Sequence, residues 1–192
     1  MKLYYSPTSP YARKVRATAI QLGVEHLIEP VAMDPLNESA DIRAINPLGK
    51  VPVLEAANGT MLCDSLVICQ YLFDVQGRSA ETLSIDLLNR HALANGLLDA
   101  SLNTVMERRR DPARQSTYWL DRWSHTIART AERSAIPTGE RFDLADLTLA
   151  IALDYLDFRL PDIDWRADAR DLDAWHAEVR EFPELVSTRA PT

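Results

Sequence analysis

Residues 6–23 read SPTSPYARKVRATAIQLG, and this stretch decides how the rest of the chain is organised. The short apolar segment KLYY, residues 2–5, precedes it, which predicts a strand, a turn and then a helix. Ser9 is a favoured N-cap residue, and Pro10 is favoured at the first helical position. Apolar or small residues then recur at helical spacing until a glycine ends the helix: Tyr11, Val15, Thr18, Leu22 and Gly23. Because a helix N-terminus carries free N–H groups, the Ser9 hydroxyl can either cap its own helix or help to hold an anion.

Composition limits the class of protein. The chain has 192 residues, enough for one large or two small domains with a sizeable core. Its formal charge of −7 disfavours binding to nucleic acid or anionic lipid. No apolar run reaches the length of about 18 residues that a membrane span needs, and the first residues lack the apolar core of a signal peptide. Cys63 and Cys69 do not make a disulfide framework, so we expect a cytoplasmic protein with two buried structural thiols.

The first 77 residues alternate between strand and helix patterns. The segment LIEPVA, residues 27–32, lies too far from the first strand to be its hairpin partner, so a parallel crossover is expected. Asn58-Gly59 lies between two apolar segments, 51–55 and 60–63, which predicts a hairpin because both residues tolerate positive φ. Helices are expected at 10–22, at 38–45 and from Asp64-Ser65 to near Gly77, with an Asn-Pro-Leu-Gly turn at 46–49.

After a linker at residues 78–83 the pattern is helical only. Asp143 and Asp146 have the spacing of a capping box, and the apolar segment after them, LTLAIALDYLDF, predicts a helix buried in a bundle. The expected helices cover 84–109, 114–134, about 143–158 and about 170–181, and the tail EFPELVSTRAPT is expected to be extended. The predicted organisation is therefore an α/β domain at 1–77, a linker at 78–83 and an all-α domain at 84–192.

Four motifs in this order resemble those of the soluble glutathione S-transferases, and they cover nearly the whole chain. They are SPYARKVR from Ser9, NPLGKVPVL from Asn46, DSLVICQYL from Asp64 and FDLADLTLAIAL from Phe142. The resemblance is closest to short bacterial members with a serine at position 9. It implies a thioredoxin-like N-terminal domain, a helical C-terminal bundle and glutathione as co-substrate. Two residues depart from the usual pattern: Asp143 stands where Ser or Thr is common, and Asp64 where Glu is common.

The resemblance gives Ser9 a catalytic role, which is to stabilise the thiolate of glutathione. The glutathione thiol should have the pKa of a free cysteine, about 8.5, and lowering this pKa by two units takes about 2.7 kcal/mol. A hydroxyl hydrogen bond to a charged sulfur contributes roughly 1.5–3 kcal/mol and a helix N-terminus roughly 0.3–2 kcal/mol, so the two together suffice. From the residues alone, Ser9 is as well explained as an N-cap, and Thr8 or Ser6 are alternative hydroxyls for the sulfur.

The resemblance also places the rest of glutathione. Asp64 and Ser65 would bind its γ-glutamyl end, where a carboxylate meets the ammonium and a helix N-terminus meets the carboxylate. Val51 would pair with the cysteinyl backbone in the manner of an added strand, beside a cis Pro52. Lys50 would meet the glycyl carboxylate. The simpler alternatives are an ordinary helix cap at Asp64-Ser65, a trans Pro52 and a solvated Lys50.

The candidate walls of a hydrophobic co-substrate pocket are Tyr11, Met106 and Arg109, with core packing as the alternative for Tyr11 and Met106. The basic residues Arg13, Lys14 and Arg16 are best explained as a solvated helix face. The four histidines lack metal-ligand spacing, so no metal is expected. Trp119 and Trp123 are explained by core or dimer packing.

The resemblance implies a homodimeric detoxification enzyme in which the glutathione thiolate attacks a small electrophile. Two alternatives stay open at this point. One is glutathione-dependent isomerase or reductase chemistry, although a serine cannot form the mixed disulfide that a reductase needs. The other is a binding or interaction protein that keeps the fold without turnover.

Overall fold

The chain folds into two compact units. A computed structural model describes residues 1–36, 40–82, 84–137 and 142–191. One unit comprises Met1–Ser84 together with Pro183–Thr192, and the other comprises Ile85–Phe182. The last ten residues therefore belong to the first unit, whereas a single division of the chain at 78–83 assigns them to the helical part.

The first unit has the order of elements that the sequence predicts, with 3₁₀ turns at Glu25–Leu27 and Ser79–Thr82. The elements are β1 (Lys2–Tyr5), α1 (Pro10–Gln21), β2 (Glu29–Ala32), α2 (Ala40–Ile45), β3 (Val53–Glu55), β4 (Met61–Leu62) and α3 (Ser65–Val75). The sheet order is β2-β1-β3-β4. β1 is parallel to β2 and antiparallel to β3, and β3 is antiparallel to β4. Residues 37–39 lie outside the described residues, and they include the first two residues of the helix predicted at 38–45.

The β3–β4 hairpin forms where Asn58-Gly59 predicts it. The Ala56 N–H donates to the Thr60 carbonyl oxygen at 2.9 Å, which closes the loop. Gly59 has φ of +81°, a conformation that a residue with a Cβ rarely adopts. The Asn58 side chain accepts a further hydrogen bond from the Thr60 N–H at 3.0 Å. Local turn chemistry alone therefore specifies this part of the fold.

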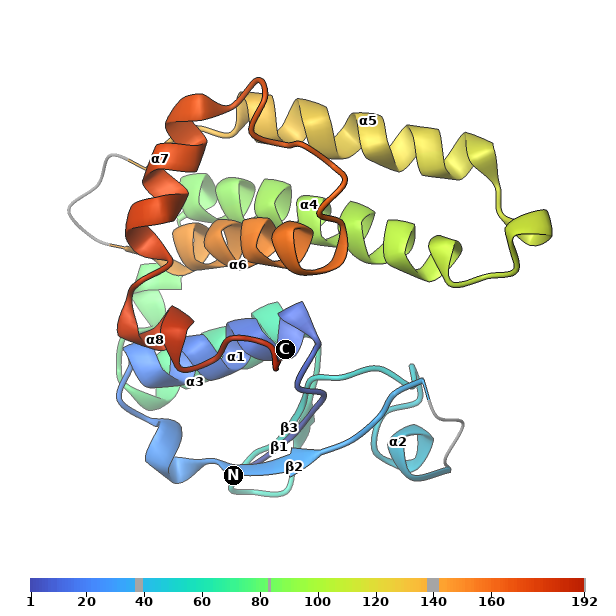
Figure 1. Ribbon diagram of the computed structural model, residues 1–192. Coiled ribbons are helices and arrows are strands. Elements are labelled where there is room, and N and C mark those ends of the chain that lie inside the picture. Colours follow the sequence, from blue (N-terminus) through green and yellow to red (C-terminus); the bar gives the residue numbers. More distant parts are fainter. Residues whose placement is uncertain (37–39, 83, 138–141, 192) are drawn as a thin grey trace. The chain divides into compact units, whose positions relative to one another are not determined.

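Helices α1 and α3 pack side by side against the sheet (Figure 1). Their contact includes a polar pair, the Thr18 hydroxyl and the Cys69 thiol, whose Oγ1 and Sγ atoms are 3.4 Å apart. Burial raises the pKa of the Cys69 thiol, which keeps it protonated and structural, as expected. The side chains that fill this layer include Leu3, Ala12, Val15, Leu54, Ile68 and Leu72.

The basic face of α1 is not solvated, so that prediction is wrong for two of its three residues. Lys14 has no exposed surface, and Arg13 is only 8% exposed. Arg13 donates from Nε to the Thr188 hydroxyl at 3.3 Å and from Nη2 to the Leu185 carbonyl oxygen at 3.0 Å. Arg16 is half-buried, with its guanidinium over the Tyr5 ring.

The C-terminal segment covers the buried face of α1. Instead of an extended tail, it forms a short helix, α8 (Pro183–Val186), with Leu185 fully buried. The Arg13 contacts with Thr188 and Leu185 fix this segment on the first unit. A guanidinium with several donors suits this task, because it satisfies a hydroxyl and a carbonyl at once.

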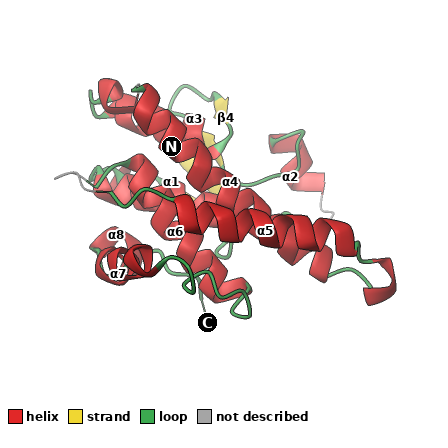
Figure 2. Ribbon diagram, turned by 90° about the horizontal axis from the view of Figure 1, so that it is seen from above, coloured by secondary structure: helices red, strands yellow, loops and turns green. Residues whose placement is uncertain are grey.

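All strands and helices found among the described residues of the second unit are helices (Figures 1 and 2). Helices α4, α5 and α6 pack together, and α6 is buried on nearly all sides, as its uniformly apolar sequence predicts. The bounds are α4 (Ile85–Arg108), a 3₁₀ turn (Pro112–Arg114), α5 (Thr117–Arg133), α6 (Leu144–Arg159) and α7 (Arg170–Val179). Residues 138–141, part of the predicted loop before α6, lie outside the described residues.

Two ion-pair groups hold α4 and α6 parallel to each other. At one end, Arg90 of α4 bonds to Asp143 and Asp146 around the first turn of α6. At the other end, Arg108 bonds to Asp162, just beyond the end of α6, with Nη1–Oδ1 and Nη2–Oδ2 distances of 2.8 and 2.9 Å. The starts of the two helices are thus adjacent, and so are their ends.

The predicted capping box opens α6. The Asp143 carboxylate accepts from the N–H groups of Ala145 and Asp146 at 2.8 and 3.0 Å. The Asp146 carboxylate accepts in return from the Asp143 N–H at 3.0 Å. Burial raises the pKa of Asp146 to about 6, and the Asp143 charge adds to this while Arg90 opposes it. The pKa of Asp143 is lowered, because its hydrogen bonds outweigh the effect of burial.

Replacement of Arg90 is expected to destabilise the protein more at neutral than at acidic pH. The raised pKa of Asp146 means that its protonated form favours folding, and this contribution is lost as pH rises through about 6. Arg90→Met removes the compensating charge, so it should lower the free energy of unfolding by about 2 kcal/mol near neutral pH. Below about pH 5 the loss should be clearly smaller. Urea denaturation at the two pH values measures both quantities.

Asp86→Ala is the matched control, because Asp86 is an exposed partner of the same arginine. It should change stability by less than about 0.5 kcal/mol at either pH. An Arg90→Met loss of equal size at both pH values would show that the buried carboxylate is not what Arg90 compensates.

Candidate active site

The predicted site residues of the first unit come together at one end of the sheet. β1 and β3 are antiparallel with Tyr4 opposite Val53, so the last residues of β1 and the first residues of β3 lie at the same end of the sheet. β4 is antiparallel to β3 with Leu62 opposite Leu54, so the end of β4 lies there too. Three segments lie at this end of the sheet. Ser6–Ser9 connects β1 to α1, Val51-Pro52 leads into β3, and Cys63-Asp64 connects β4 to α3. The N-termini of α1 and α3 therefore both begin at this end.

Ser9 caps α1. Its hydroxyl oxygen accepts a hydrogen bond from the Ala12 N–H at 3.2 Å, and its carbonyl oxygen accepts from the Arg13 N–H at 2.9 Å. The Ser9 N–H donates to the Ser6 carbonyl oxygen at 3.0 Å, which closes the turn after β1. The Ser9 side chain is half-buried. All three bonds fix the hydroxyl at the start of the helix.

Capping and anion binding do not exclude each other at Ser9. A serine hydroxyl has one O–H donor as well as two acceptor lone pairs. The bond to Ala12 uses an acceptor position, so the O–H donor can still be directed to a ligand. The hydroxyls of Ser6 and Thr8 are 3.5 Å apart and face each other, so each can donate to the other. Ser9 is therefore the hydroxyl of this segment that the helix N-terminus positions.

The loop before β3 holds Val51 and Pro52. The Val51–Pro52 peptide is cis, as the family resemblance implies. Both side chains are buried, and no described residue forms a hydrogen bond with the Val51 backbone N–H or C=O. A backbone donor and acceptor on one residue can pair with an extended peptide. Lys50 next to it is exposed.

Asn46 organises this loop, a role that sequence reasoning did not assign. The Asn46 side chain is buried, donates from Nδ2 to the Lys50 carbonyl oxygen at 2.9 Å and accepts from the Leu48 N–H at 3.0 Å. The Asn-Pro-Leu-Gly turn signal was visible in the sequence. The turn alone could not show that the asparagine amide reaches Lys50 and sets the backbone just before Val51.

Asp64 and Ser65 open α3. Asp64 is the N-cap, and its Oδ1 accepts from the N–H groups of Leu66 and Val67 at 3.0 and 3.4 Å. Within the described residues Oδ2 has no hydrogen-bond partner, and the side chain is exposed. Ser65 is buried in the first turn. The peptide between Cys63 and Asp64 is cis. One carboxylate oxygen thus caps the helix while the other is open to a cationic group.

These features suit a small peptide that carries charges of both signs. The N-termini of α1 and α3 supply partial positive charge and N–H donors for anionic groups. The Asp64 carboxylate supplies an acceptor for an ammonium group. The Val51 backbone can pair with a peptide unit, and the Ser9 hydroxyl can donate to an atom that carries negative charge.

The predicted co-substrate residues are divided between the two units. Tyr11 lies in the first turn of α1 and is half-buried. Met106, also half-buried, and the exposed Arg109 lie at the end of α4 in the second unit.

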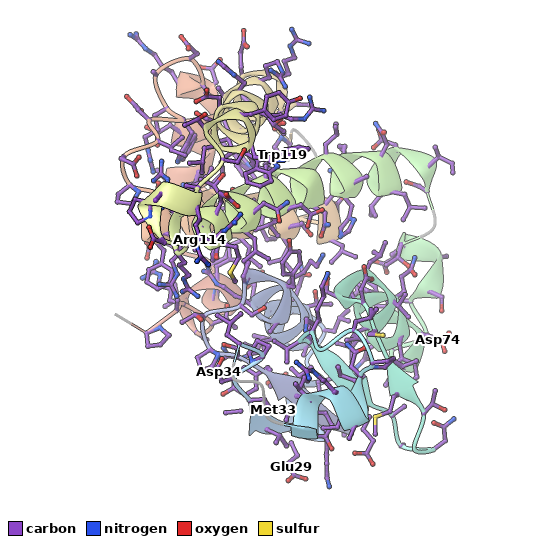
Figure 3. The ribbon with its side chains drawn as sticks, turned by 90° about the vertical axis from the view of Figure 1, so that its right-hand side faces the viewer. Glu29, Met33, Asp34, Asp74, Arg114 and Trp119 are labelled. Atoms are coloured by element: carbon purple, nitrogen blue, oxygen red, sulfur yellow. The ribbon has the colours of Figure 1, made fainter. Side chains whose placement is uncertain are left out.

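The structure corrects one minor prediction, for Cys63, and narrows another, for Trp119. Cys63 is exposed, so only Cys69 is a buried thiol. Trp119, in the first turn of α5 (Figure 3), is 44% exposed and stacks on Trp123 with ring centroids 5.5 Å apart, so core packing does not explain it and dimer packing stays a prediction. Among the described residues, no helix combines the length and the apolarity needed to cross a bilayer.

Both halves of the chain match domains of one known family. Residues 3–80 match the glutathione S-transferase N-terminal domain, and residues 118–178 match the glutathione S-transferase C-terminal domain. A protein of Escherichia coli K12, described as the uncharacterized GST-like protein YibF, is 32% identical over 180 residues. That match covers 88% of each chain.

Solved structures extend the likeness to the whole fold. A glutathione transferase family member from Pseudomonas fluorescens Pf-5, with bound glutathione, is 34% identical with a TM-score of 0.89. The match covers 100% of this chain and 99% of that one. A glutathione S-transferase from Methylobacillus flagellatus KT, also with glutathione bound, is 31% identical with a TM-score of 0.89 and the same coverage.

Two substitutions of Asp64 separate the effect of its helix-capping hydrogen bonds on stability from the effect of its charge. Asp64→Ala removes the acceptor for two helix N–H groups and should lower the free energy of unfolding by about 1 kcal/mol. Asp64→Asn keeps an equivalent cap and should stay within a few tenths of a kcal/mol of the native chain. Urea denaturation of the three proteins measures the difference. Equal stability of Asp64→Ala and the native chain would contradict the capping role.

Proposed function

The chain belongs to the glutathione S-transferase family, and from that premise we propose that it is a glutathione transferase. It binds glutathione, holds the thiol as thiolate with the Ser9 hydroxyl, and directs it at a small hydrophobic electrophile. The observation that carries the proposal is the geometry of Ser9. Its oxygen accepts the Ala12 N–H at the start of α1, which leaves the O–H donor for a sulfur anion.

The energetics of this step match what the site offers. A free thiol with a pKa of about 8.5 is only a few per cent ionised at neutral pH. Bringing the pKa down by two units takes about 2.7 kcal/mol. A hydroxyl hydrogen bond to the charged sulfur supplies roughly 1.5–3 kcal/mol, and the α1 N-terminus adds roughly 0.3–2 kcal/mol. No general base is required.

The reaction is a nucleophilic attack by sulfur. The thiolate electron pair forms a carbon–sulfur bond at the electrophilic carbon. Either a leaving group departs with the electrons of its bond, or an activated double bond accepts them and takes a proton from water. Ser9 stabilises the sulfur anion before the attack and transfers no proton itself. A serine hydroxyl cannot form a mixed disulfide, which disfavours reductase chemistry at this position.

The remaining site residues bind the rest of glutathione. The free Oδ2 of Asp64 meets the γ-glutamyl ammonium, and the α3 N-terminus with the Ser65 hydroxyl meets the neighbouring carboxylate. The N–H and C=O of Val51, fixed beside the cis Pro52, pair with the cysteinyl unit. Lys50 is the cation available for the glycyl carboxylate.

The wider assignments follow from the same premise. The proposed walls of the co-substrate pocket are Tyr11, Met106 and Arg109. The proposed assembly is a homodimer in which the N-terminal unit of one copy contacts the helical unit of the other. Large apolar side chains are exposed on both units, as such a contact requires: Met61 and Val67 on the first, and Ile85, Leu93 and Trp119 on the second. The proposed role is cytoplasmic detoxification.

The thiol pKa of bound glutathione tests the mechanism. Thiolate absorbance titrated against pH should give a pKa about two units below that of free glutathione in the native chain. Ser9→Ala and Ser9→Gly both remove the hydroxyl, so both should raise this pKa by at least about one unit. The pair is matched, because glycine is a good N-cap and alanine is a poor one, so only Ser9→Ala should lose about 1 kcal/mol of stability.

Each alternative has its own outcome. A pKa that stays low in both variants would assign the sulfur contact to Thr8, Ser6 or the backbone N–H groups. Glutathione bound with an unshifted pKa in the native chain would contradict the transferase mechanism in favour of a binding role. No binding at all would point to an interaction protein.

A further inference from the structure

Arg13 joins the first turns of α1 to the C-terminal segment, residues 183–191. Its backbone N–H donates to the Ser9 carbonyl oxygen at 2.9 Å, which is the first backbone hydrogen bond of α1. Its side chain donates from Nε to the Thr188 hydroxyl at 3.3 Å and from Nη2 to the Leu185 carbonyl oxygen at 3.0 Å. Because only 8% of Arg13 is exposed, these side-chain bonds are shielded from water. One residue thus contacts both the Ser9 backbone and a segment 172 to 175 residues further along the chain.

The C-terminal segment lies beside α1 in the same unit (Figure 1). Its helix α8 has four residues, which is too short to be stable in isolation. Leu185 and Thr188 have no exposed surface. The Thr188 hydroxyl accepts from Arg13 and donates to the Glu184 carbonyl oxygen at 2.7 Å, so it links α1 to the turn of α8. The segment therefore depends for its order on what it contacts in the first unit.

The contacts of α1 hold the helix in both of its halves. The Thr18 hydroxyl and the Cys69 thiol join the second half of α1 to α3. The Arg13 bonds join the first half, where Ser9 lies, to the C-terminal segment. Loss of the Arg13 bonds should therefore let the Ser9 end of α1 move while the other end stays in place.

The proposed role of Ser9 depends on the position of this end. The Ala12 bond, at 3.2 Å, fixes the Ser9 hydroxyl relative to its own helix. It does not fix α1 relative to Val51 and Asp64, which lie on other elements and are proposed to hold the rest of glutathione. A hydrogen bond weakens steeply when its angle at the hydrogen falls below about 120°. The placement of α1 therefore decides how well the Ser9 hydroxyl meets the sulfur.

A structural role explains part of the Arg13 contact. A cation is favoured at the C-terminus of a helix, and the Arg13 guanidinium lies at the end of α8. This reason would hold equally for an arginine on any turn of α1. It does not account for an attachment point that lies one turn after the residue proposed to stabilise the thiolate.

We propose that Arg13 and Thr188 are positioning residues of the glutathione site, which act through α1 to hold the Ser9 hydroxyl against the sulfur. The inference rests on the proposed transferase function and adds the C-terminal segment to the groups that support its first step. The two residues favour ionisation of the bound thiol, and they contact neither glutathione nor the electrophile.

The thiol pKa of bound glutathione separates a positioning role from a structural one. Thr188→Val keeps the size of the side chain and removes the hydroxyl that accepts from Arg13. It should raise this pKa by about half a unit, roughly half of the shift expected for Ser9→Ala. Arg13→Lys keeps the charge but loses the geometry of the guanidinium donors, so it should raise the pKa at least as much. Thr188→Ser restores the hydroxyl and should restore the native pKa. Thiolate absorbance of the glutathione complexes measures each value.

Two controls accompany these variants. Ser187→Ala is the matched substitution, because the exposed Ser187 donates to the Pro183 carbonyl oxygen within the same segment. It should leave the bound-thiol pKa at its native value. S-methylglutathione has no ionisable thiol, so every variant should bind it within about twofold of the native affinity by calorimetry.

The outcomes distinguish the inference from the proposed function. An unchanged bound-thiol pKa in Thr188→Val overturns the inference even if the variant is less stable, because the contact then serves stability alone. An equal shift in Ser187→Ala overturns it too, and so does a matching loss of affinity for S-methylglutathione. All three results leave the transferase function standing. An unshifted thiol pKa in the native complex overturns the transferase mechanism, and the inference with it.

Discussion

The hydrogen bond from the Ala12 N–H to the Ser9 hydroxyl is the contact on which the proposed chemistry depends. It ends the turn after β1, starts α1 and fixes a hydroxyl where the helix presents its positive end. Because the bond uses the oxygen as acceptor, the cap and the thiolate donor are two uses of one group. Ser9 can therefore cap its helix and donate to a sulfur at the same time.

Much of the fold could be predicted because its signals are local. Asn58-Gly59 specifies the hairpin, Ser9-Pro10 and Asp64-Ser65 start two helices, and the capping box at Asp143 starts a third. Each of these is a short-range hydrogen-bond pattern that a few residues determine. The antiparallel pairing of β1 with β3 then brings distant segments to one end of the sheet, so the residues predicted to bind glutathione lie together there. Their roles remain predictions.

What the sequence did not reveal depends on contacts between distant residues. Arg13 resembles a solvated helix residue until the tail returns and offers the Leu185 carbonyl and the Thr188 hydroxyl. Asn46 resembles an ordinary turn residue until its amide reaches Lys50. No local pattern encodes such environments.

The crystal structure of the glutathione complex tests the central claim most directly. The account predicts that the Ser9 Oγ lies within hydrogen-bonding distance of the glutathione sulfur while it still accepts from the Ala12 N–H. A sulfur that contacts Thr8 or Ser6 instead would contradict the account. So would a Ser9 hydroxyl that has left Ala12 to reach the sulfur.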